Sequence, residues 1–249
     1  MSAVVNAHGQ PVGQPLPDWK AARRPQRITL AGHYTRLVPV DAAHHAEALF
    51  DAYQNPTDVP IWTYLKAGPF DTVGDYRAYL QTVAAHNDPL HYTIFDLDRP
   101  VETSAVGTIA LMRQDPDNGV IEVGWVAFSP RLRRTRAASE TLYLLAKYVF
   151  DVLGYRRLEW KCDALNQPSR DAAARFGFSY EGTFRQAIVT HGRNRDTAWF
   201  SMLDSEWPTV RAAYDAWLAP HNFDRHGRQQ HRLAIPRDDA GHVKTAISG

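Results

Sequence analysis

Residues 126–153 read VAFSPRLRRTRAASETLYLLAKYVFDVL, and this stretch decides the fold. A short apolar strand end, 126–128, runs through Ser129 and Pro130 into a turn that holds four arginines, Arg131, Arg133, Arg134 and Arg136. The following residues predict a helix, because apolar side chains recur at three- and four-residue spacing, at Ala138, Leu142, Leu145, Val149 and Leu153. Ser139 and Glu140 fall off this apolar stripe, and Gly154 suits a C-terminal cap.

The junction between this strand and this helix is a candidate phosphate site. The first turn of a helix leaves backbone N–H groups without partners, and the helix dipole favours negative charge there. The arginines add formal positive charge. A solvated surface cluster is the alternative, but such clusters do not usually lie between a buried strand and a buried helix.

Composition limits the classes of function. The chain has 249 residues, of which 44% are hydrophobic, and this suits one sizeable domain. The net charge of +1 gives no overall attraction to nucleic acid. We expect a cytoplasmic protein that binds neither nucleic acid nor membrane, because the N-terminus lacks a secretory pattern and no apolar run could span a bilayer. Cys162 is the single cysteine, and the 11 histidines show no metal-ligand spacing, so we expect no disulfide and no metal.

The chain divides into three parts. Residues 1–26 are rich in Pro, Gly and Gln and predict a disordered arm, residues 27–220 form the folded domain, and residues 221–249 form a polar tail. Within the domain, strands are expected at 34–40, 91–96, 104–112, 120–128, 157–162, 184–189 and 197–203. Helices are expected from 41, from about 72, over 136–153, around 168–177 and over 206–218. Because hairpin-linked and helix-linked strands mix, the order predicts an α+β domain with a mixed, mainly antiparallel central sheet flanked by helices.

Three short motifs follow one another along this order. They are Arg133-Arg134-Thr135-Arg136-Ala137-Ala138; Asn166-Gln167-Pro168-Ser169 before Gly177-Phe178 and Glu181-Gly182; and Gly192 with Asp196 before Glu206-Trp207. The chain therefore resembles the GNAT superfamily of acyl-CoA N-acyltransferases over residues 35–208, and within it the branch of ribosomal-protein N-terminal acetyltransferases. The resemblance implies a sheet that is splayed at the acyl-CoA site and acetyl-CoA as co-substrate.

The same resemblance assigns the residues that hold acetyl-CoA. It implies that the pantetheine arm adds to the strand end, and that the pyrophosphate lies on the basic turn. The implied contacts are Val126, Ala127, Phe128, Arg133, Arg134, Thr135, Arg136, Ala137, Ala138, Ser139 and Asn166. Arg136 replaces the first glycine of the motif; we expect its side chain to add a contact to the phosphates. Ala173 stands where many members have a tyrosine acid, and Ile188 where the branch has a glutamate base.

Glu122 and Ser169 are the candidate catalytic residues. Strand alternation puts Glu122, Gly124 and Val126 on one face, and Val123, Trp125 and Ala127 on the other. Acetyl transfer to an amine needs a base for the amine proton, a donor for the oxyanion and an acid for the thiolate. Glu122 is the expected base or else a paired carboxylate, and Ser169 is the expected acid or CoA donor, or else a helix cap. The oxyanion donor is expected to be a backbone N–H within 126–128.

Several side chains could contact the acceptor. Trp62, Tyr64, Phe70 and Trp125 either line its pocket or belong to the core. Arg185, Gln186, His191 and Arg193 near the last hairpin either steer an acidic or peptide acceptor or form a solvated tip. The hairpin and the final helix are also a candidate surface for a homodimer.

The leading function is N-acetyl transfer from acetyl-CoA to a primary amine, either a protein N-terminus or a small amine, by direct attack. The alternative is a non-catalytic acyl-CoA-binding or regulatory module. Nucleic-acid binding through the arginines is disfavoured because the net charge is +1 and no wider basic stripe exists.

Overall fold

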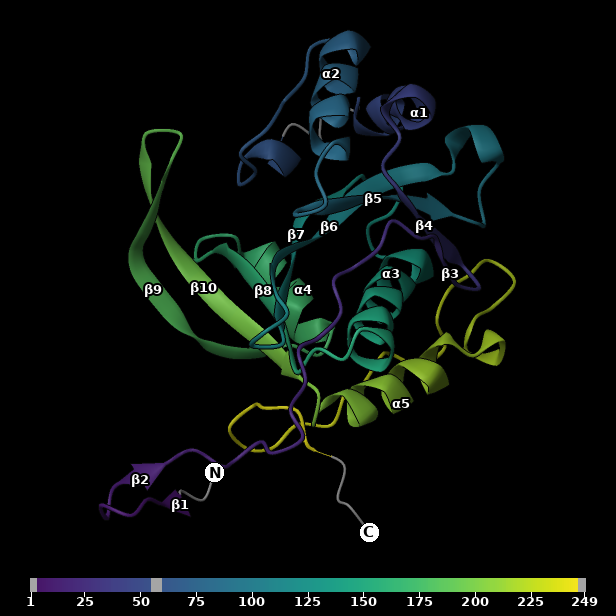
Figure 1. Cartoon of the computed structure of the whole chain (residues 1–249). Coiled ribbons are helices and arrows are strands. Elements are labelled where there is room, and N and C mark those ends of the chain that lie inside the picture. The colour runs from purple at the N-terminus through teal and green to yellow at the C-terminus, as the bar shows by residue number, and fades with distance from the viewer. Residues whose placement is uncertain (1–3, 55–59, 246–249) are drawn as a thin grey trace.

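The computed structural model describes residues 4–54 and 60–245. Its centre is an eight-stranded sheet in the order β3-β4-β5-β6-β7-β8-β10-β9 (Figure 1). The strands are β3 (Leu30–Ala31), β4 (Thr35–Pro39), β5 (Leu90–Asp96), β6 (Ala105–Asp115), β7 (Val120–Phe128), β8 (Arg157–Asp163), β9 (Ser179–Thr190) and β10 (Arg193–Leu203). Only β7 and β8 pair in parallel, so the predicted mixed, mainly antiparallel sheet is confirmed.

Helices cover both faces of this sheet. They are α1 (Ala42–Tyr53), α2 (Val73–Ala84), α3 (Arg136–Lys147), α4 (Gln167–Arg175) and α5 (Trp207–Leu218). Figure 1 shows α1 and α2 together at one side, and α3 and α5 at the other. A large apolar core joins the sheet to α3 and α5, and a smaller aromatic core lies under α1 and α2. The two cores bury opposite faces of β5, β6 and β7.

Most helix starts follow from capping residues in the sequence. The side chains of Asp41, Thr72, Thr135 and Asn166 accept hydrogen bonds from the first-turn N–H groups of α1, α2, α3 and α4. The helix predicted over 136–153 is α-helical only to Lys147 and continues as a π-helical stretch, Tyr148–Val152. A π-helical turn leaves no clear pattern in the sequence, so the apolar periodicity did not predict it.

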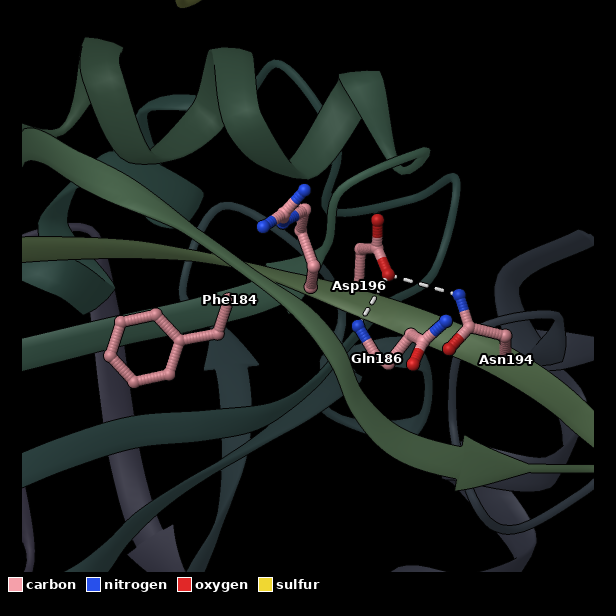
Figure 2. Close-up of a pocket in the computed structure, with 5 residues that line it drawn as sticks. Phe184, Gln186, Asn194 and Asp196 are labelled. Carbon is pink, nitrogen blue, oxygen red and sulfur yellow. Dashed lines mark hydrogen bonds between the residues drawn. The ribbon is translucent and has the colours of Figure 1, made fainter.

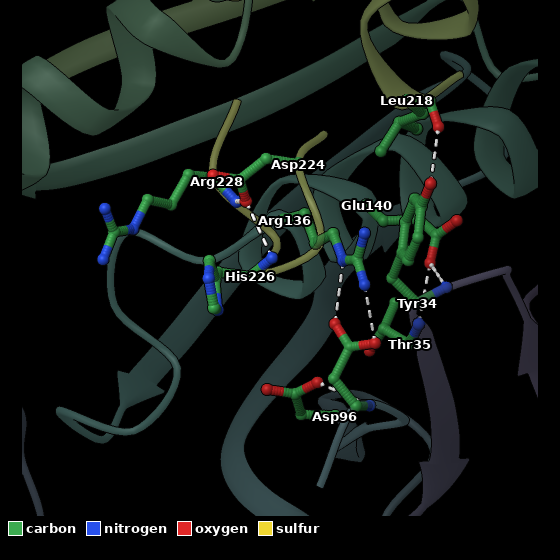
Figure 3. Close-up of polar contacts among 10 residues, drawn as sticks. Tyr34, Thr35, Asp96, Arg136, Glu140, Leu218, Asp224, His226 and Arg228 are labelled. Atoms are coloured by element: carbon green, nitrogen blue, oxygen red, sulfur yellow. Dashed lines mark hydrogen bonds and ion pairs between the residues drawn. The ribbon is translucent and has the colours of Figure 1, made fainter. Parts of the chain in front are cut away.

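Glu140 has a structural role that the helical pattern did not predict. Although it falls off the apolar stripe, it is only 4% exposed. Its carboxylate accepts backbone N–H groups of His33 (2.8 Å), Tyr34 (2.7 Å) and Thr35 (2.7 Å) at the start of β4 (Figure 3). Gly32 makes room for it, because a Cβ at that position would lie 2.4 Å from the carboxylate. Glu140 therefore fastens α3 to the sheet edge.

The strands β7 and β8 separate partway along their length. Their parallel pairing covers four positions and ends at Val123 and Trp160, whereas β7 continues to Phe128 and β8 to Asp163. Among the described residues, the far half of β7 consequently has no strand neighbour on its β8 side. This is the splay that the resemblance implied.

Two bulges flank Glu122 and correct the predicted alternation. Between the pairs Thr108–Ala127 and Ala110–Gly124, β7 has one residue more than β6, and Trp125 there has a φ of 51°. Val126 and Phe128 therefore pack on the α3 side, while Ala127 packs with α1 and α2. The prediction that Val126 shares the face of Glu122 is wrong, because a bulge reverses the alternation that follows it.

The segments at both ends of the chain contact the domain. Backbone N–H groups of Ala22 and Arg23 donate to Pro116 and Leu153. Beyond α5, Arg237 donates to one carbonyl in the last turn of α4 and to another between α4 and β9, and Val243 is buried. A short β1 (Val4–Val5) and β2 (Pro11–Val12) pair lies apart from the main sheet. Within the described residues, no helix has the length and apolar character needed to cross a membrane.

Replacing Glu140 should destabilise the fold. Glu140→Ala leaves three N–H groups of the β4 turn without their acceptor, and we expect a loss of about 3 kcal/mol in the free energy of unfolding. Glu140→Gln keeps one carbonyl acceptor and should lose less. Urea unfolding measures both variants, and a loss below about 0.5 kcal/mol for Glu140→Ala, the range of ordinary surface changes, would contradict this role.

Candidate active site

The basic turn ends in an open helix start. Arg134 adopts a left-handed φ of 63°, and Thr135 then caps α3 by accepting the N–H of Ala138 at 3.1 Å. In the described part of the chain, the N–H groups of Arg134, Arg136 and Ala137 have no acceptor. Unpaired N–H groups at a helix start suit an anion, because they add to the positive end of the helix dipole.

Arg136 is the exception among the arginines of the turn. Its guanidinium forms two hydrogen bonds with Asp98, at 2.8 and 2.7 Å, and lies 4.0 Å from the ring centre of Tyr34 (Figure 3). The ring of Phe223 and the loop at Gly227 lie on it as well. This side chain is directed to the β5–β6 turn and the C-terminal segment, so the structure gives it partners other than the expected phosphate.

The remaining arginines of the turn differ in their contacts and in their exposure to solvent. Arg131 forms an ion pair with Asp51 of α1 at 2.9 Å. Arg133 donates its Nε–H to the carbonyl of Phe128 at 3.0 Å, and both Arg133 and Arg134 are exposed. Arg133 and Arg134 are therefore the side chains that can add mobile positive charge beside the open N–H groups.

The free edge of β7 fits an extended ligand. The bulge at Trp125 and Val126 takes backbone groups out of the ladder with β6, and β8 has already diverged on the other side. The hydroxyl of Tyr53 donates to the carbonyl of Ala127 at 2.8 Å, which fixes this segment against α1. Residues 124–128 thus offer backbone hydrogen-bonding groups to an added strand-like chain.

Glu122 lies at the base of the splay. It is 6% exposed, and its Oε2 forms ion pairs with Lys161 Nζ at 2.9 Å and Arg113 Nε at 3.3 Å. The other oxygen, Oε1, lies beside Gly124, where a Cβ would be 3.5 Å away. Burial raises the pKa of Glu122, while Lys161 and Arg113 act in the opposite direction. One oxygen is therefore held and the other is directed along the strand.

A buried row of charges continues from Glu122. Lys161, whose side chain is 8% exposed, also contacts Glu159 at 2.7 Å, and its Nζ lies 3.8 Å from the ring centre of Trp199. Lys161 Nζ therefore lies between two carboxylates and forms an ion pair with each. Arg157 links Glu159 to Glu181. These alternating charges therefore lie on the same face of the sheet as Glu122.

Ser169 and Asn166 lie at the start of α4 beside the end of β8. Asn166 is the helix cap, since its side chain accepts the N–H of Ser169 at 3.2 Å. The hydroxyl oxygen of Ser169 accepts the indole N–H of Trp160 at 3.1 Å. Burial raises the pKa of the neighbouring Cys162 thiol, and a hydrogen bond with Ser169 acts in the opposite direction. The one hydroxyl hydrogen of Ser169 therefore has the Cys162 sulfur as a partner and must turn to reach a ligand. Trp160 is the last β8 residue paired with β7, so Ser169 borders the splay.

The four aromatic candidates for the acceptor pocket fall in different places. Trp62 is buried and packs with Phe70 against the α1–α2 aromatic core. Tyr64 is half-buried and its hydroxyl donates to the carbonyl of Leu165 at 3.4 Å. Trp125 lies against His91, with ring centres 5.9 Å apart. Tyr64 thus comes nearest to α4, while Trp62 and Phe70 support the loop that carries it.

The long β9–β10 hairpin reaches over the same face. Figure 2 shows how Asp196 holds it: one oxygen accepts the N–H of Gln186 at 2.7 Å and the side-chain amide of Asn194 at 2.9 Å. This carboxylate fixes a bulge in β9, where Gln186 has a φ of 51°. At the tip, His191 Nε2 lies 2.9 Å from the carbonyl of Leu65. The aspartate of the third motif therefore shapes the hairpin.

Sequence reasoning did not single out Lys161, Arg113 or Tyr53. Lys161 and Glu159 alternate on β8 with apolar residues, and this two-residue spacing of charges was the one signal that could have indicated them. Arg113 reaches Glu122 from a bulge in β6, where its φ is 50°. No sequence pattern indicates that bulge, because the residue is not a glycine.

Comparison with known proteins gives a consistent family. The model of the "Acetyltransferase (GNAT) domain" matches residues 35–179. A Brucella melitensis GCN5-related N-acetyltransferase structure is 46% identical, with a TM-score of 0.84, and the match covers 88% of this chain and 97% of that one. A GNAT-family structure from Chromobacterium violaceum is 41% identical, with a TM-score of 0.72, over 80% and 98%. A proposed ribosomal N-acetyltransferase of Bacillus subtilis is 31% identical over 69% of this chain and 90% of its own length.

Substitutions of two arginines of the basic turn should distinguish an arginine that attracts CoA by its charge from one that stabilises the fold. Arg134→Ala removes an exposed cation beside the open N–H groups, so CoA affinity should fall less steeply as salt rises. Arg136→Ala should leave that slope nearly unchanged, because its guanidinium is neutralised by Asp98, and should instead lower the melting temperature. Calorimetric titration of CoA over a range of salt concentrations measures the slopes. A lower slope for Arg136→Ala alone would contradict this assignment.

Proposed function

Because the chain belongs to the GNAT acetyltransferase family, we propose that it transfers an acetyl group from acetyl-CoA to a primary amine by direct attack. The family makes it an acyltransferase and supplies acetyl-CoA as co-substrate. The observation that carries the proposal is the juxtaposition of a splayed β7 edge, an open helix start and a buried, oriented carboxylate, Glu122.

The residues present fit acetyl-CoA. The N–H groups of Arg134, Arg136 and Ala137 would hold the pyrophosphate, with Arg133 and Arg134 adding charge. The backbone of 124–128 would pair with the pantetheine amides. Ala137 and Ala138 are both buried and small, so the helix start can approach a ligand closely. When bound, acetyl-CoA supplies the thioester.

Glu122 acts as the base. An amine is mostly protonated at neutral pH and cannot attack until it loses a proton. Glu122 Oε1 takes that proton, directly or through a water, while Lys161 and Arg113 hold Oε2. Burial raises the pKa of the carboxyl, which makes it a better proton acceptor than an exposed glutamate once it is ionised.

The other two roles belong to backbone and hydroxyl groups at the splay. A backbone N–H within 126–128 donates to the oxygen that gains negative charge as the amine nitrogen bonds to the acetyl carbon. The carbon–sulfur bond then breaks, and Ser169 donates a proton towards the sulfur. Ser169 recovers a proton from solvent. The nitrogen loses a second proton as the amide forms, and this proton, like the first, leaves through Glu122 to solvent. No covalent enzyme intermediate forms in this scheme.

The acceptor is a primary amine at a protein N-terminus or on a small molecule. The relative from Bacillus subtilis is named for ribosomal N-acetylation, which favours a protein N-terminus. The loop with Tyr64 and the hairpin tip at His191 contact each other through Leu65, so these two segments together would border the approach of the acceptor. Ile188 offers no carboxylate on the hairpin, which leaves Glu122 as the base.

Glu122→Gln should lower kcat at least 100-fold at neutral pH, the low end of what general-base catalysis contributes. In the native protein, kcat should rise with pH through the raised pKa of Glu122, because the base must be ionised. In the Glu122→Gln variant, kcat should no longer rise with pH in this way, and the affinity for CoA should be unchanged. Thiol release with a panel of amines and N-terminal peptides measures the rates. Turnover like that of the native protein would exclude Glu122 as the base.

Thiol release also separates catalysis from simple binding. Calorimetry should detect acetyl-CoA binding, and at least one amine of the panel should release the thiol with formation of its amide. Binding without release from any amine would contradict the proposed transfer and favour the non-catalytic module.

A further inference from the structure

Three residues of β10 carry buried polar atoms that have no hydrogen-bond partner among the described residues. The pairing of β10 with β8 runs without interruption from Thr197–Asp163 to Leu203–Arg157, so alternate residues share a face. Trp199 lies under Lys161 on the face of Glu122. Thr197 shares that face, and Arg195 continues the row because the extra residues of the nearby bulge belong to β9. In the described residues, Arg195 Nε, Thr197 Oγ1 and Trp199 Nε1 are buried and unpaired.

Arg195 is the unbalanced charge of this row. The other cations of the face, Lys161, Arg157 and Arg113, each have a carboxylate within 3.3 Å. The side chain of Arg195 is half-buried, and within residues 4–54 and 60–245 its guanidinium forms neither an ion pair nor a hydrogen bond. Its partner across the hairpin is the aliphatic Ile188. A half-buried guanidinium without a counter-charge is costly, and an anionic ligand removes that cost.

The nearby carboxylate of Asp163 does not neutralise Arg195. Asp163 is the β8 residue opposite Thr197, and its Oδ1 accepts the N–H of Leu165 at 2.9 Å. Among the described side chains, it forms no ion pair with Arg195. Asp163 therefore shapes the turn before α4 and leaves the guanidinium available.

The position of Arg195 suits the acceptor rather than the CoA arm. The N–H of Ala164 donates to the carbonyl of Asp196 at 2.9 Å, which places Arg195 next to Leu165. Leu165 in turn accepts the hydroxyl of Tyr64 from the aromatic loop. At about 3.3 Å per residue, the Cα of Arg195 lies roughly 13 Å along β10 from that of Trp199, on the hairpin side of the splay. An acceptor extending from Glu122 towards the hairpin would pass this row.

We propose that Arg195, with the hydroxyl of Thr197 and the indole N–H of Trp199, binds a carboxylate of the acceptor. The inference rests on the proposed acetyl transfer and specifies its substrate class: an amine that also carries a carboxylate, such as an amino acid or a short acidic peptide. A carboxylate only accepts hydrogen bonds, and these three groups can all donate. Arginine is suited to it because its planar guanidinium can bond both oxygens.

Binding of product analogues tests this site without depending on turnover. The probes are N-acetyl-alanine, N-acetyl-dialanine and N-acetyl-trialanine, each as the free carboxylate and as the C-terminal amide, titrated by calorimetry into the CoA-loaded protein. We expect at least one carboxylate to bind 10-fold or more tightly than its amide. Arg195→Gln should abolish that preference, and Arg195→Lys should retain part of it. The matched control is Arg232→Gln in the exposed segment beyond α5, which has no role in the proposed acceptor binding and should keep the preference.

Equal affinity of each carboxylate and its amide, including no measurable binding of either, would overturn the carboxylate site. Retention of the preference in Arg195→Gln would overturn the role of Arg195, provided that the variant melts like the native protein. Thiol release is scored separately. If the carboxylates bind more tightly than their amides but no amine releases the thiol, only the proposed acetyl transfer is contradicted. If an amine releases the thiol but the carboxylates bind no more tightly than their amides, only the proposed acceptor class is contradicted.

Discussion

The parallel ladder between β7 and β8 stops at Val123 and Trp160, and the rest of the site depends on that ending. Beyond it, β7 bulges at Trp125 while Trp160 bonds to Ser169 of α4, so the two strands take different neighbours. The gap exposes backbone groups of 124–128 that a continuous sheet would have paired. It also brings the start of α3, the start of α4 and Glu122 to the borders of one opening.

Buried charge on the sheet is organised around the same opening. Glu122, Lys161, Glu159 and Arg157 alternate in sign, so each buried charge faces an opposite one. Removing one member of such a row leaves an uncompensated buried charge. The free-energy cost of that charge is larger than the net stabilisation that the intact row contributes. The row therefore acts chiefly to orient Glu122, by holding one of its oxygens and leaving the other directed to the splay. Arg195 lies outside this balance, and that is why it is the side chain that most requires an external anion.

The sequence predicts the strands and helices well, but it does not predict the bulges or the long-range partners of buried side chains. Strand β7 has the predicted bounds, and Asp41, Thr72 and Pro168 mark helix starts as expected, because capping and periodicity are local properties. The bulges at Arg113 and Trp125 escape prediction because neither position has the glycine that a positive φ favours. The partners of Glu140 and Arg136 also escape it, since both side chains are satisfied by segments distant in the chain. The motifs located the candidate site, but they could not reveal how its side chains are paired.

Hydrogen–deuterium exchange of the native protein, with and without acetyl-CoA, tests the central claim most directly. The free edge of β7 and the open start of α3 should both become protected when the ligand binds, so slowed exchange is expected at residues 124–128 and 134–137 together. Strands β4 and β5, which are already paired, should change little. Binding that protects neither segment, or that protects only segments remote from the splay, would contradict the account.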